Sequence, residues 1–158
     1  PVKYAPRSLK KKDFIKQKKQ ILKTRKLYKK GKYITRKKVS SYKSKPSKHL
    51  VNVKKVYNID KLKLNKELQN KTKCKLKSLE KIIKKGQGAY FSSGSRPNQT
   101  SHSWGVARLA SAITGGKSSV VDYNILEEGC KKSSKALKLA KKAKKTINMT
   151  RKIPHLKI

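Results

Sequence analysis

The stretch KKGQGAYFSSGSRPNQTSHSWGVARLASAITGGKSSVVDYNILEEG, residues 84–129, differs in composition from the chain on either side of it. Between residues 86 and 130 there are three basic and three acidic residues, seven of the eight glycines and the single tryptophan. A charge-balanced block that holds most of the turn-forming residues is typical of a compact module. We therefore expect a folded module over residues 65–130, between a basic N-terminal arm, 1–64, and a basic C-terminal tail, 131–158.

Local signals inside this block predict short helices joined by a polar loop. Gly94 and Pro97 interrupt a preceding helix, because glycine is flexible and proline lacks an amide hydrogen. Thr100 or Ser101 can cap a helix that runs to about Thr114 and is closed by two glycines. A capping-box pattern that begins at Ser119 predicts a last short helix. The expected core of the module consists of Trp104, Leu109, Ile113, Ile125 and Leu126.

The two flanks carry almost all of the charge. Residues 1–85 hold 32 basic and 4 acidic residues, residues 131–158 hold 11 basic and none acidic, and the whole chain is +39. Repulsion on this scale penalises a compact chain in water, so we expect the arms to take shape on polyanionic or acidic partners. Hydrophobic residues make up 34% of the chain. This is below the roughly 45–50% of globular domains, so only part of the chain can form a core.

Several classes of protein are disfavoured by the same composition. No run approaches the ~18 apolar residues of a membrane span, and no apolar run follows the basic N-terminal residues as in a signal peptide. Cys74 and Cys130 do not make a disulfide framework, and their positions leave open whether they meet. A reducing compartment is the default expectation for such a chain.

The N-terminal arm predicts one long helix and two short strands. A helix over about residues 9–30 has Ser8 as its N-cap and Gly31 at its C-terminal end. Its narrow apolar stripe either packs on the module or leaves the helix to be ordered by a partner. That stripe consists of Phe14, Ile21 and Tyr28, with Ile15 and Leu22 alongside. Short strands are predicted at about 33–39 and 50–59, either as a hairpin or paired with another chain.

Two further helices are expected from composition and periodicity. The segment KLKSLEKIIKKG has its apolar residues on one face and predicts a helix over residues 75–86 that ends at Gly86. The segment KKSSKALKLAKKAKKT is a strong helix former, although a disordered basic tail or a helix docked on an acidic protein remain alternatives. The predicted fold class is mainly α: a small helical module with long basic arms and one short β-hairpin.

The segment GQGAYFSSGSRPNQTSHSWGVARLASAITGGK, residues 86–117, resembles an uncharacterised domain of large nucleocytoplasmic DNA viruses of algae and protists, with looser relatives in phages. The basic segments YAPRSLKKKD and TRKLYKKGKYITRKKV look like versions attached to this domain in giant-virus proteins. The resemblance implies viral origin and a family of unknown function. For such a basic viral protein we expect a location in the inner capsid or core of the virion, and in the host cytoplasm or nucleus during assembly. The resemblance implies no catalytic residues, because none are established for that family.

Catalytic and metal-binding patterns are weak. The loop SSGSRPNQT can hold a phosphate at a helix N-terminus, or it can form a self-satisfied turn in which Arg96 pairs with Asp122 or Glu128. His102 lies between two serines but has no nearby acidic residue to orient it as a catalytic triad requires. The histidines and cysteines lack paired ligand spacing. We therefore expect no metal, no cofactor and no enzyme activity.

Two functions from different classes remain. The first is a non-enzymatic structural virion protein, a basic minor capsid or core component that cements shell proteins such as the major capsid protein and contacts the genome. The alternative is a sequence-independent protein that binds and condenses viral DNA by neutralising phosphates. Neither needs a small-molecule substrate. The expected contacts are Lys10, Lys11, Lys12, Lys18, Lys19, Arg25, Lys26, Lys29, Lys30, Arg36, Lys37, Lys38, Arg96, Lys141, Lys142, Lys144 and Lys145.

Overall fold

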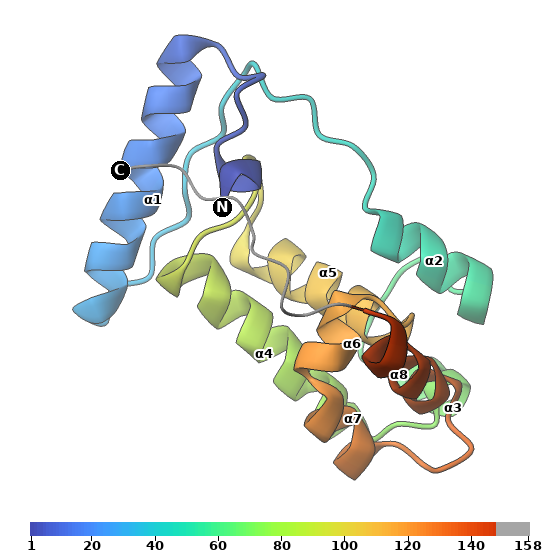
Figure 1. Ribbon diagram of the computed structural model, residues 1–158. Coiled ribbons are helices and arrows are strands. Elements are labelled where there is room, and N and C mark those ends of the chain that lie inside the picture. Colours follow the sequence, from blue (N-terminus) through green and yellow to red (C-terminus); the bar gives the residue numbers. More distant parts are fainter. Residues whose placement is uncertain (148–158) are drawn as a thin grey trace. The chain divides into compact units, whose positions relative to one another are not determined.

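The computed structural model describes residues 1–147, which form eight α-helices and no β-strand (Figure 1). The mainly α fold class is therefore confirmed. No helix in the described part of the chain is long and apolar enough to cross a membrane. After a 3₁₀ helix η1 (Val2–Tyr4), the helices are α1 (Lys11–Lys29), α2 (Lys48–Tyr57), α3 (Lys66–Thr72), α4 (Leu76–Ser92), α5 (Ser101–Ile113), α6 (Lys117–Val121), α7 (Tyr123–Gly129) and α8 (Lys135–Thr146).

The chain divides into two compact units. Unit 1 comprises residues 1–45 and 87–104, and unit 2 comprises 46–86 and, of the described residues, 105–147. The boundaries fall inside α4 and α5, so each of these helices contributes to both units. This division differs from the predicted boundaries at residues 64 and 130. Residues 1–45 form a compact unit with a segment of the predicted module and are not a separate arm.

Helix α1 confirms the predicted N-terminal helix but starts differently. Its N-cap is Lys10 rather than Ser8, and the Lys10 amide donates to Ser41 Oγ at 3.1 Å. Ser41, thirty-one positions along the chain, therefore accepts the hydrogen bond of the amide at the start of this helix. At the other end Gly31 has the left-handed φ of +76° and donates to Tyr28 O, as predicted for this glycine. The buried side of α1 consists of Gln17, Ile21 and Thr24.

The predicted β-hairpin does not form within residues 1–147. Polar side chains take the place of a second strand beside residues 33–39. Gln20 bonds both the carbonyl and the amide of Lys37, and Asn98 does the same for Val39. Because a carboxamide offers both a donor and an acceptor, it satisfies the backbone of one residue as a neighbouring strand would.

The second predicted strand, residues 50–59, is largely the helix α2. The strand is expected from the even spacing of Val51, Val53, Tyr57 and Ile59. Val53, Val56 and Tyr57, however, lie at spacings of three and four and so share one helical face. The Tyr57 hydroxyl donates to the carbonyl of Ile113 and anchors α2 within unit 2. Burial raises the pKa of Tyr57.

Helix α4 does not end at Gly86 but continues to Ser92. A Cβ on Gly86 would lie 2.7 Å from the Cα of Gly105, which belongs to α5. Two glycines at this point allow the backbones of α4 and α5 to approach closely inside unit 2. The glycine that resembles a helix terminator is therefore required for a helix crossing.

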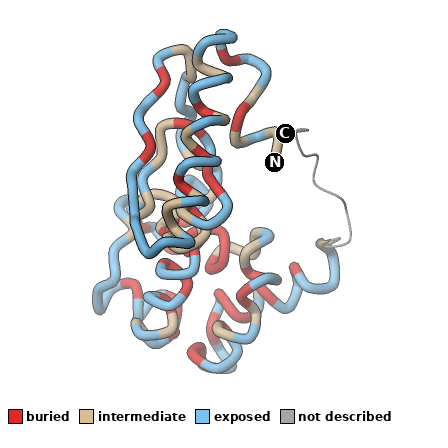
Figure 2. The backbone as a smooth tube through the Cα atoms, turned by 90° about the vertical axis from the view of Figure 1, so that its left-hand side faces the viewer, coloured by how far each residue is buried: buried red, intermediate tan, exposed pale blue. Residues whose placement is uncertain are grey.

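The core of unit 2 contains most of the predicted module core. Leu109, Ile113 and Leu126 are fully buried, and Ile125 packs against the same cluster. Buried positions recur on one side of the helices while the other side is exposed (Figure 2). Trp104 is not part of this core: it is half-buried in unit 1, where it packs edge to face with Tyr4, with ring centres 5.7 Å apart.

The predicted capping box at Ser119 does not open the helix that contains Ile125 and Leu126. Ser119 Oγ donates to Gly116 O inside α6, and a separate helix, α7, carries Ile125 and Leu126. Helix α8 packs on α6 and α7. It forms as composition predicts, with Ser134 accepting the Leu137 amide at its N-cap. Its buried face consists of Ala136, Leu137, Ala140 and Ala143. Residues 148–158 of the predicted tail lie outside the described residues.

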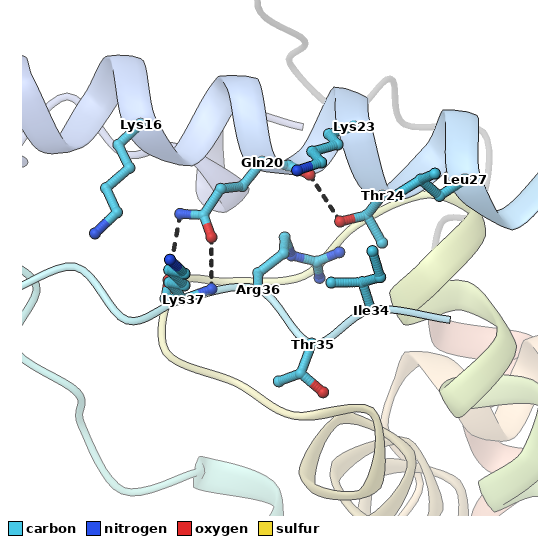
Figure 3. Close-up of a pocket in the computed structure, with 9 residues that line it drawn as sticks. All are labelled: Lys16, Gln20, Lys23, Thr24, Leu27, Ile34, Thr35, Arg36 and Lys37. Carbon is cyan, nitrogen blue, oxygen red and sulfur yellow. Dashed lines mark hydrogen bonds between the residues drawn. The ribbon is translucent and has the colours of Figure 1, made fainter. Parts of the chain in front are cut away.

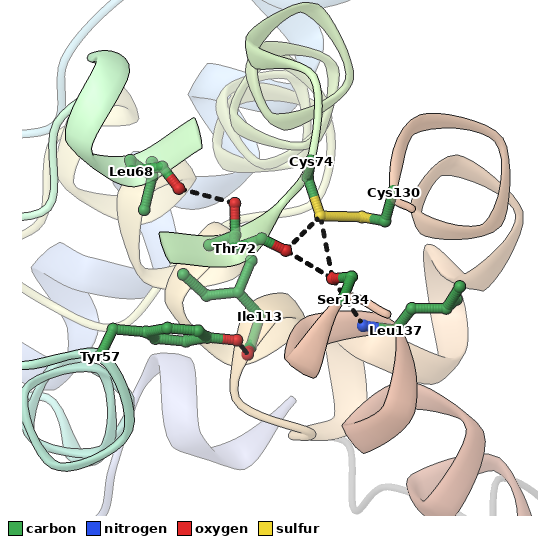
Figure 4. The surroundings of a disulfide bond; sticks show 8 residues. All are labelled: Tyr57, Leu68, Thr72, Cys74, Ile113, Cys130, Ser134 and Leu137. Atoms are coloured by element: carbon green, nitrogen blue, oxygen red, sulfur yellow. Dashed lines mark hydrogen bonds between the residues drawn. A yellow bond between two sulfur atoms is a disulfide. The ribbon is translucent and has the colours of Figure 1, made fainter. Parts of the chain in front are cut away.

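Cys74 and Cys130 form a disulfide in unit 2 (Figure 4). Their segments meet as an isolated antiparallel bridge, with the Lys75 amide donating to Gly129 O and the Lys131 amide to Lys73 O, each at 2.9 Å. This pairing brings the two Cα atoms to 3.9 Å. The bond links the start of α4 to the end of α7. The sequence leaves open whether the two cysteines meet, and the backbone pairing at this bridge brings them together.

The α4–α5 crossing gives a matched pair of variants. Gly86→Ala is expected to lower the free energy of unfolding by about 1–3 kcal/mol, because the methyl group would overlap the backbone of Gly105. Gly88→Ala is the control in the same helix: apart from the adjoining turns of its own helix, nothing lies within 4 Å of its Cβ position. There alanine should raise stability by about 0.5–1 kcal/mol. Urea unfolding followed by circular dichroism measures both, and equal effects would contradict the crossing.

The disulfide gives a second test. Its cysteines are 56 positions apart, and losing a bond that closes a loop of this length is expected to cost roughly 2–4 kcal/mol. The Tm of the wild type should therefore fall in dithiothreitol towards that of the double variant Cys74→Ala/Cys130→Ala. The variant itself should not respond to reductant. A wild-type Tm that is the same with and without dithiothreitol would argue against the disulfide.

Candidate polyanion-binding site

Unit 1 concentrates positive charge. Its described residues contain 20 Lys and Arg and a single carboxylate, Asp13. Asp13 Oδ2 accepts the Ser41 amide at 2.9 Å at the start of α1. Hydrogen bonds from the Ser41 side chain and backbone lower the pKa of this carboxyl group, so it stays ionised at neutral pH. One charge cannot balance twenty, so unit 1 presents a strongly positive field.

A partly open pocket of about 260 Å³ lies between α1 and the extended residues that follow it (Figure 3). Four of its nine lining residues are cationic and none is acidic. Helix α1 contributes five lining residues from one of its sides, and the extended segment opposite contributes the four consecutive residues 34–37. The lining consists of Lys16, Gln20, Lys23, Thr24, Leu27, Ile34, Thr35, Arg36 and Lys37.

Arg36 is the buried member of this group, with 7% of its surface exposed. Its Cζ lies 3.8 Å from the centre of the Tyr90 ring, Nη1 donates to Tyr90 O at 2.8 Å, and Nη2 donates to Ser95 Oγ at 2.7 Å. The backbone amide of Arg36 also donates to the Tyr90 hydroxyl. Burial lowers the pKa of the guanidinium group. The electron-rich ring face and two oxygen acceptors compensate for lost water, so a cation is held here without a carboxylate.

The predicted contact residues are divided between the units. Lys141, Lys142, Lys144 and Lys145 are exposed on α8 of unit 2, where Lys144 Nζ lies 4.3 Å from the ring centre of Tyr123. In unit 1, Lys18 and Arg25 are half-buried, and Arg25 Nε donates to Ser93 O. The exposed predicted residues of unit 1 are Lys10, Lys11, Lys12, Lys19, Lys26, Lys29, Lys30, Lys37, Lys38 and Arg96.

Sequence reasoning found only part of the pocket. Arg36 and Lys37 were among the predicted contacts, whereas Lys16, Lys23 and the neutral lining residues were not. The signal available for the missed residues is their spacing, because Lys16, Gln20 and Lys23 lie within two turns on one side of α1. Nothing in the spacing alone indicates that residues 34–37 face them.

The side chains of the loop SSGSRPNQT bond within the chain, as the self-satisfied turn predicts. Ser95 Oγ accepts from Arg36 and donates to Arg96 O. Thr100 and Ser103 cap each other at the start of α5, where each side-chain oxygen accepts the other residue's amide. Arg96 is predicted to form an ion pair with Asp122 or Glu128, but Asp122 pairs with a different arginine. Arg108 holds that carboxylate at 2.8 and 2.9 Å.

The arrangement supports anion binding better than acid–base chemistry. Lysines that line an open pocket can neutralise several phosphate oxygens, and each contact is a charge-assisted hydrogen bond. Within residues 1–147 no three His, Cys, Asp or Glu side chains gather in a way that could hold a metal ion. His102 is exposed on the first turn of α5.

Comparison with known proteins adds a family but no activity. No curated protein and no solved structure matches the chain. One family model, described as a family of unknown function (DUF5824), matches residues 1–127. That match includes all of unit 1 that is described, together with α2, α3, α6 and most of α7. Because it spans most of the 158 residues, the chain belongs to this family of unknown function, DUF5824.

Proposed function

We propose that this protein is a non-enzymatic basic virion protein that binds nucleic acid through its phosphate backbone. The pocket of unit 1 carries the proposal, because Lys16, Lys23 and Lys37 line it beside the buried Arg36 and no carboxylate lines it. Phosphate oxygens are strong acceptors for such donors. The exposed lysines of α1 extend the positive surface beyond the pocket. The placement in a virion rests on the resemblance of residues 86–117 to the viral domain.

Binding is proposed to be independent of sequence. Base edges are read chiefly by Arg, Asn and Gln side chains, which form paired hydrogen bonds. In unit 1, three such side chains already have partners inside the chain: Arg36 with Tyr90 and Ser95, Gln20 with Lys37, and Asn98 with Val39. The lysines of the pocket and of α1 are suited to phosphates, which carry no sequence information.

Salt dependence tests the proposal directly. Binding to a short mixed-sequence DNA duplex should weaken linearly on a plot of log K against log salt concentration. The triple variant Lys16→Gln/Lys23→Gln/Lys37→Gln should reduce the slope by about 1–3, since each phosphate contact contributes about 0.9. Fluorescence anisotropy across a potassium chloride series measures both slopes.

A triple variant in unit 2 controls for net charge. Lys61→Gln/Lys63→Gln/Lys77→Gln removes the same charge from exposed positions outside the pocket. We expect it to change the slope less than the pocket variant does. An equal change would mean that binding is diffuse and that the pocket is not the site. A wild type that does not bind DNA would overturn the proposed function.

The alternative role, in which the protein cements shell proteins, is favoured by one observation. Ile15 and Leu22 lie seven residues apart on α1 and are 42% and 39% exposed. Apolar side chains on an otherwise charged helix suit a protein contact. Hydrogen bonds from Gln20, Ser41 and Asn98 hold parts of residues 1–45 within the chain, and they support the cementing role less.

The two roles predict different outcomes for one variant. Ile15→Ser/Leu22→Ser should leave the affinity for duplex DNA unchanged, because no positive charge is removed. If the protein cements a shell, the same variant should lose co-sedimentation with DNA-free shells of the virus that encodes it. Sedimentation of the variant at the wild-type level would count against the cementing role.

A further inference from the structure

Three aromatic side chains from two distant parts of the sequence meet at one end of α1 in unit 1. Tyr28 lies in the last turn of α1, Tyr33 follows it, and Phe91 lies in the last turn of α4. The rings of Tyr28 and Phe91 are parallel within 5°, with centres 6.4 Å apart. The Tyr33 ring is tilted against both, at 5.8 Å from Tyr28 and 5.3 Å from Phe91. We call these three residues the aromatic cluster.

The turn after α1 fixes the position of Tyr33. Gly31 adopts a φ of +76°, and the Lys32 amide donates to Leu27 O at 2.9 Å. These are the bonds of a helix-ending turn that reverses the chain. The turn returns Tyr33 to the end of the helix that it has just left, beside Tyr28. The backbone therefore fixes where the Tyr33 side chain begins, and its ring lies against Tyr28 and Phe91 although the side chain is open to solvent.

Tyr33 is the most exposed of the large hydrophobic side chains in unit 1, at 65%. Tyr28 and Phe91 are half-buried. An aromatic ring that lies against two others and is left open to water on one side is an unused contact surface. Packing within the chain accounts for Tyr28 and Phe91. It does not account for the outward position of Tyr33.

Lysines flank the two tyrosines of the aromatic cluster along the chain. These are Lys29, Lys30 and Lys32, and all three are exposed. The single carboxylate of unit 1, Asp13, lies in the first turn of α1, at the opposite end of that helix. An acidic partner protein would match the charge, but only a nucleic acid matches both features, because it offers flat π faces joined by phosphates.

We propose that Tyr28, Tyr33 and Phe91 form a base-stacking platform for single-stranded nucleic acid, an inference that rests on the proposed binding of phosphate backbones. Unpaired bases stack on exposed aromatic rings while lysines follow the backbone. Bases in a duplex are already stacked on one another and gain nothing from the ring. The platform therefore selects strands with unpaired bases, whereas the pocket by itself binds any phosphate backbone.

The test compares two oligonucleotides of equal length and charge, a dT oligomer and an oligomer of the same length with abasic sites throughout. Wild-type protein should bind dT about 5–150-fold more tightly, since stacking on an aromatic side chain contributes about 1–3 kcal/mol per base. Tyr33→Ala should bring the two affinities close to each other without changing the salt slope. Tyr33→Phe keeps the ring and should retain the preference. Anisotropy of labelled oligomers gives all of these values.

Lys32→Gln is the matched control, because it removes a neighbouring charge and leaves every ring in place. It should weaken binding of dT and of the abasic oligomer by the same factor. Equal wild-type affinity for the two oligomers would overturn the platform, and with a steep salt slope it would leave the proposed function standing. Equal weakening of dT, abasic and duplex binding by Tyr33→Ala would also overturn the platform. Absence of binding to all three would overturn both proposals.

Discussion

The guanidinium of Arg36 lies over the ring of Tyr90 and donates to Tyr90 O and Ser95 Oγ, and the arrangement of unit 1 depends on this contact. It joins the segment after α1 to the end of α4 and to the loop that leads into α5. In most proteins a buried cation is paired with a carboxylate. Unit 1 has one carboxylate for 20 basic residues, so ring faces, carbonyls and hydroxyls provide the partners instead.

The same shortage of acid explains other contacts in unit 1. Gln20 and Asn98 satisfy the backbone of the segment at residues 33–39, and Ser41 satisfies the start of α1. Unit 2 contains the other six acidic residues, and there a fully buried carboxylate, Asp122, is held by Arg108 and by Lys85 at 3.3 Å. Neutral partners inside unit 1 leave its lysines available to an external polyanion.

The sequence predicted those elements whose signals are local. Helix α1 with its end at Gly31, helix α5 with its cap at Thr100, and the buried face of α8 follow from periodicity and capping residues. Errors occurred where a local signal has two physical causes. Gly86 fits a helix end and a helix crossing equally well, and the apolar residues of α2 fit two periods. For Gly86, only the close approach of Gly105 shows that the residue lies at a helix crossing and not at a helix end.

The candidate site was less predictable than the fold. A list of exposed lysines follows directly from composition, but the pocket requires Lys16 and Lys23 to face residues 34–37, and this contact depends on Gln20. The aromatic cluster likewise joins Tyr28 and Tyr33 to Phe91, about sixty positions away in the chain. No spacing rule connects such residues. They are brought together by the tertiary structure of unit 1.

The disulfide also has a topological consequence. Cys74 and Cys130 close a covalent ring of backbone, and the segment 87–104, around which unit 1 is built, lies within that ring. A protease that cut beside the exposed Arg96 would break the main chain there. The two fragments would nevertheless stay linked through sulfur, and they would separate as distinct polypeptides only after reduction.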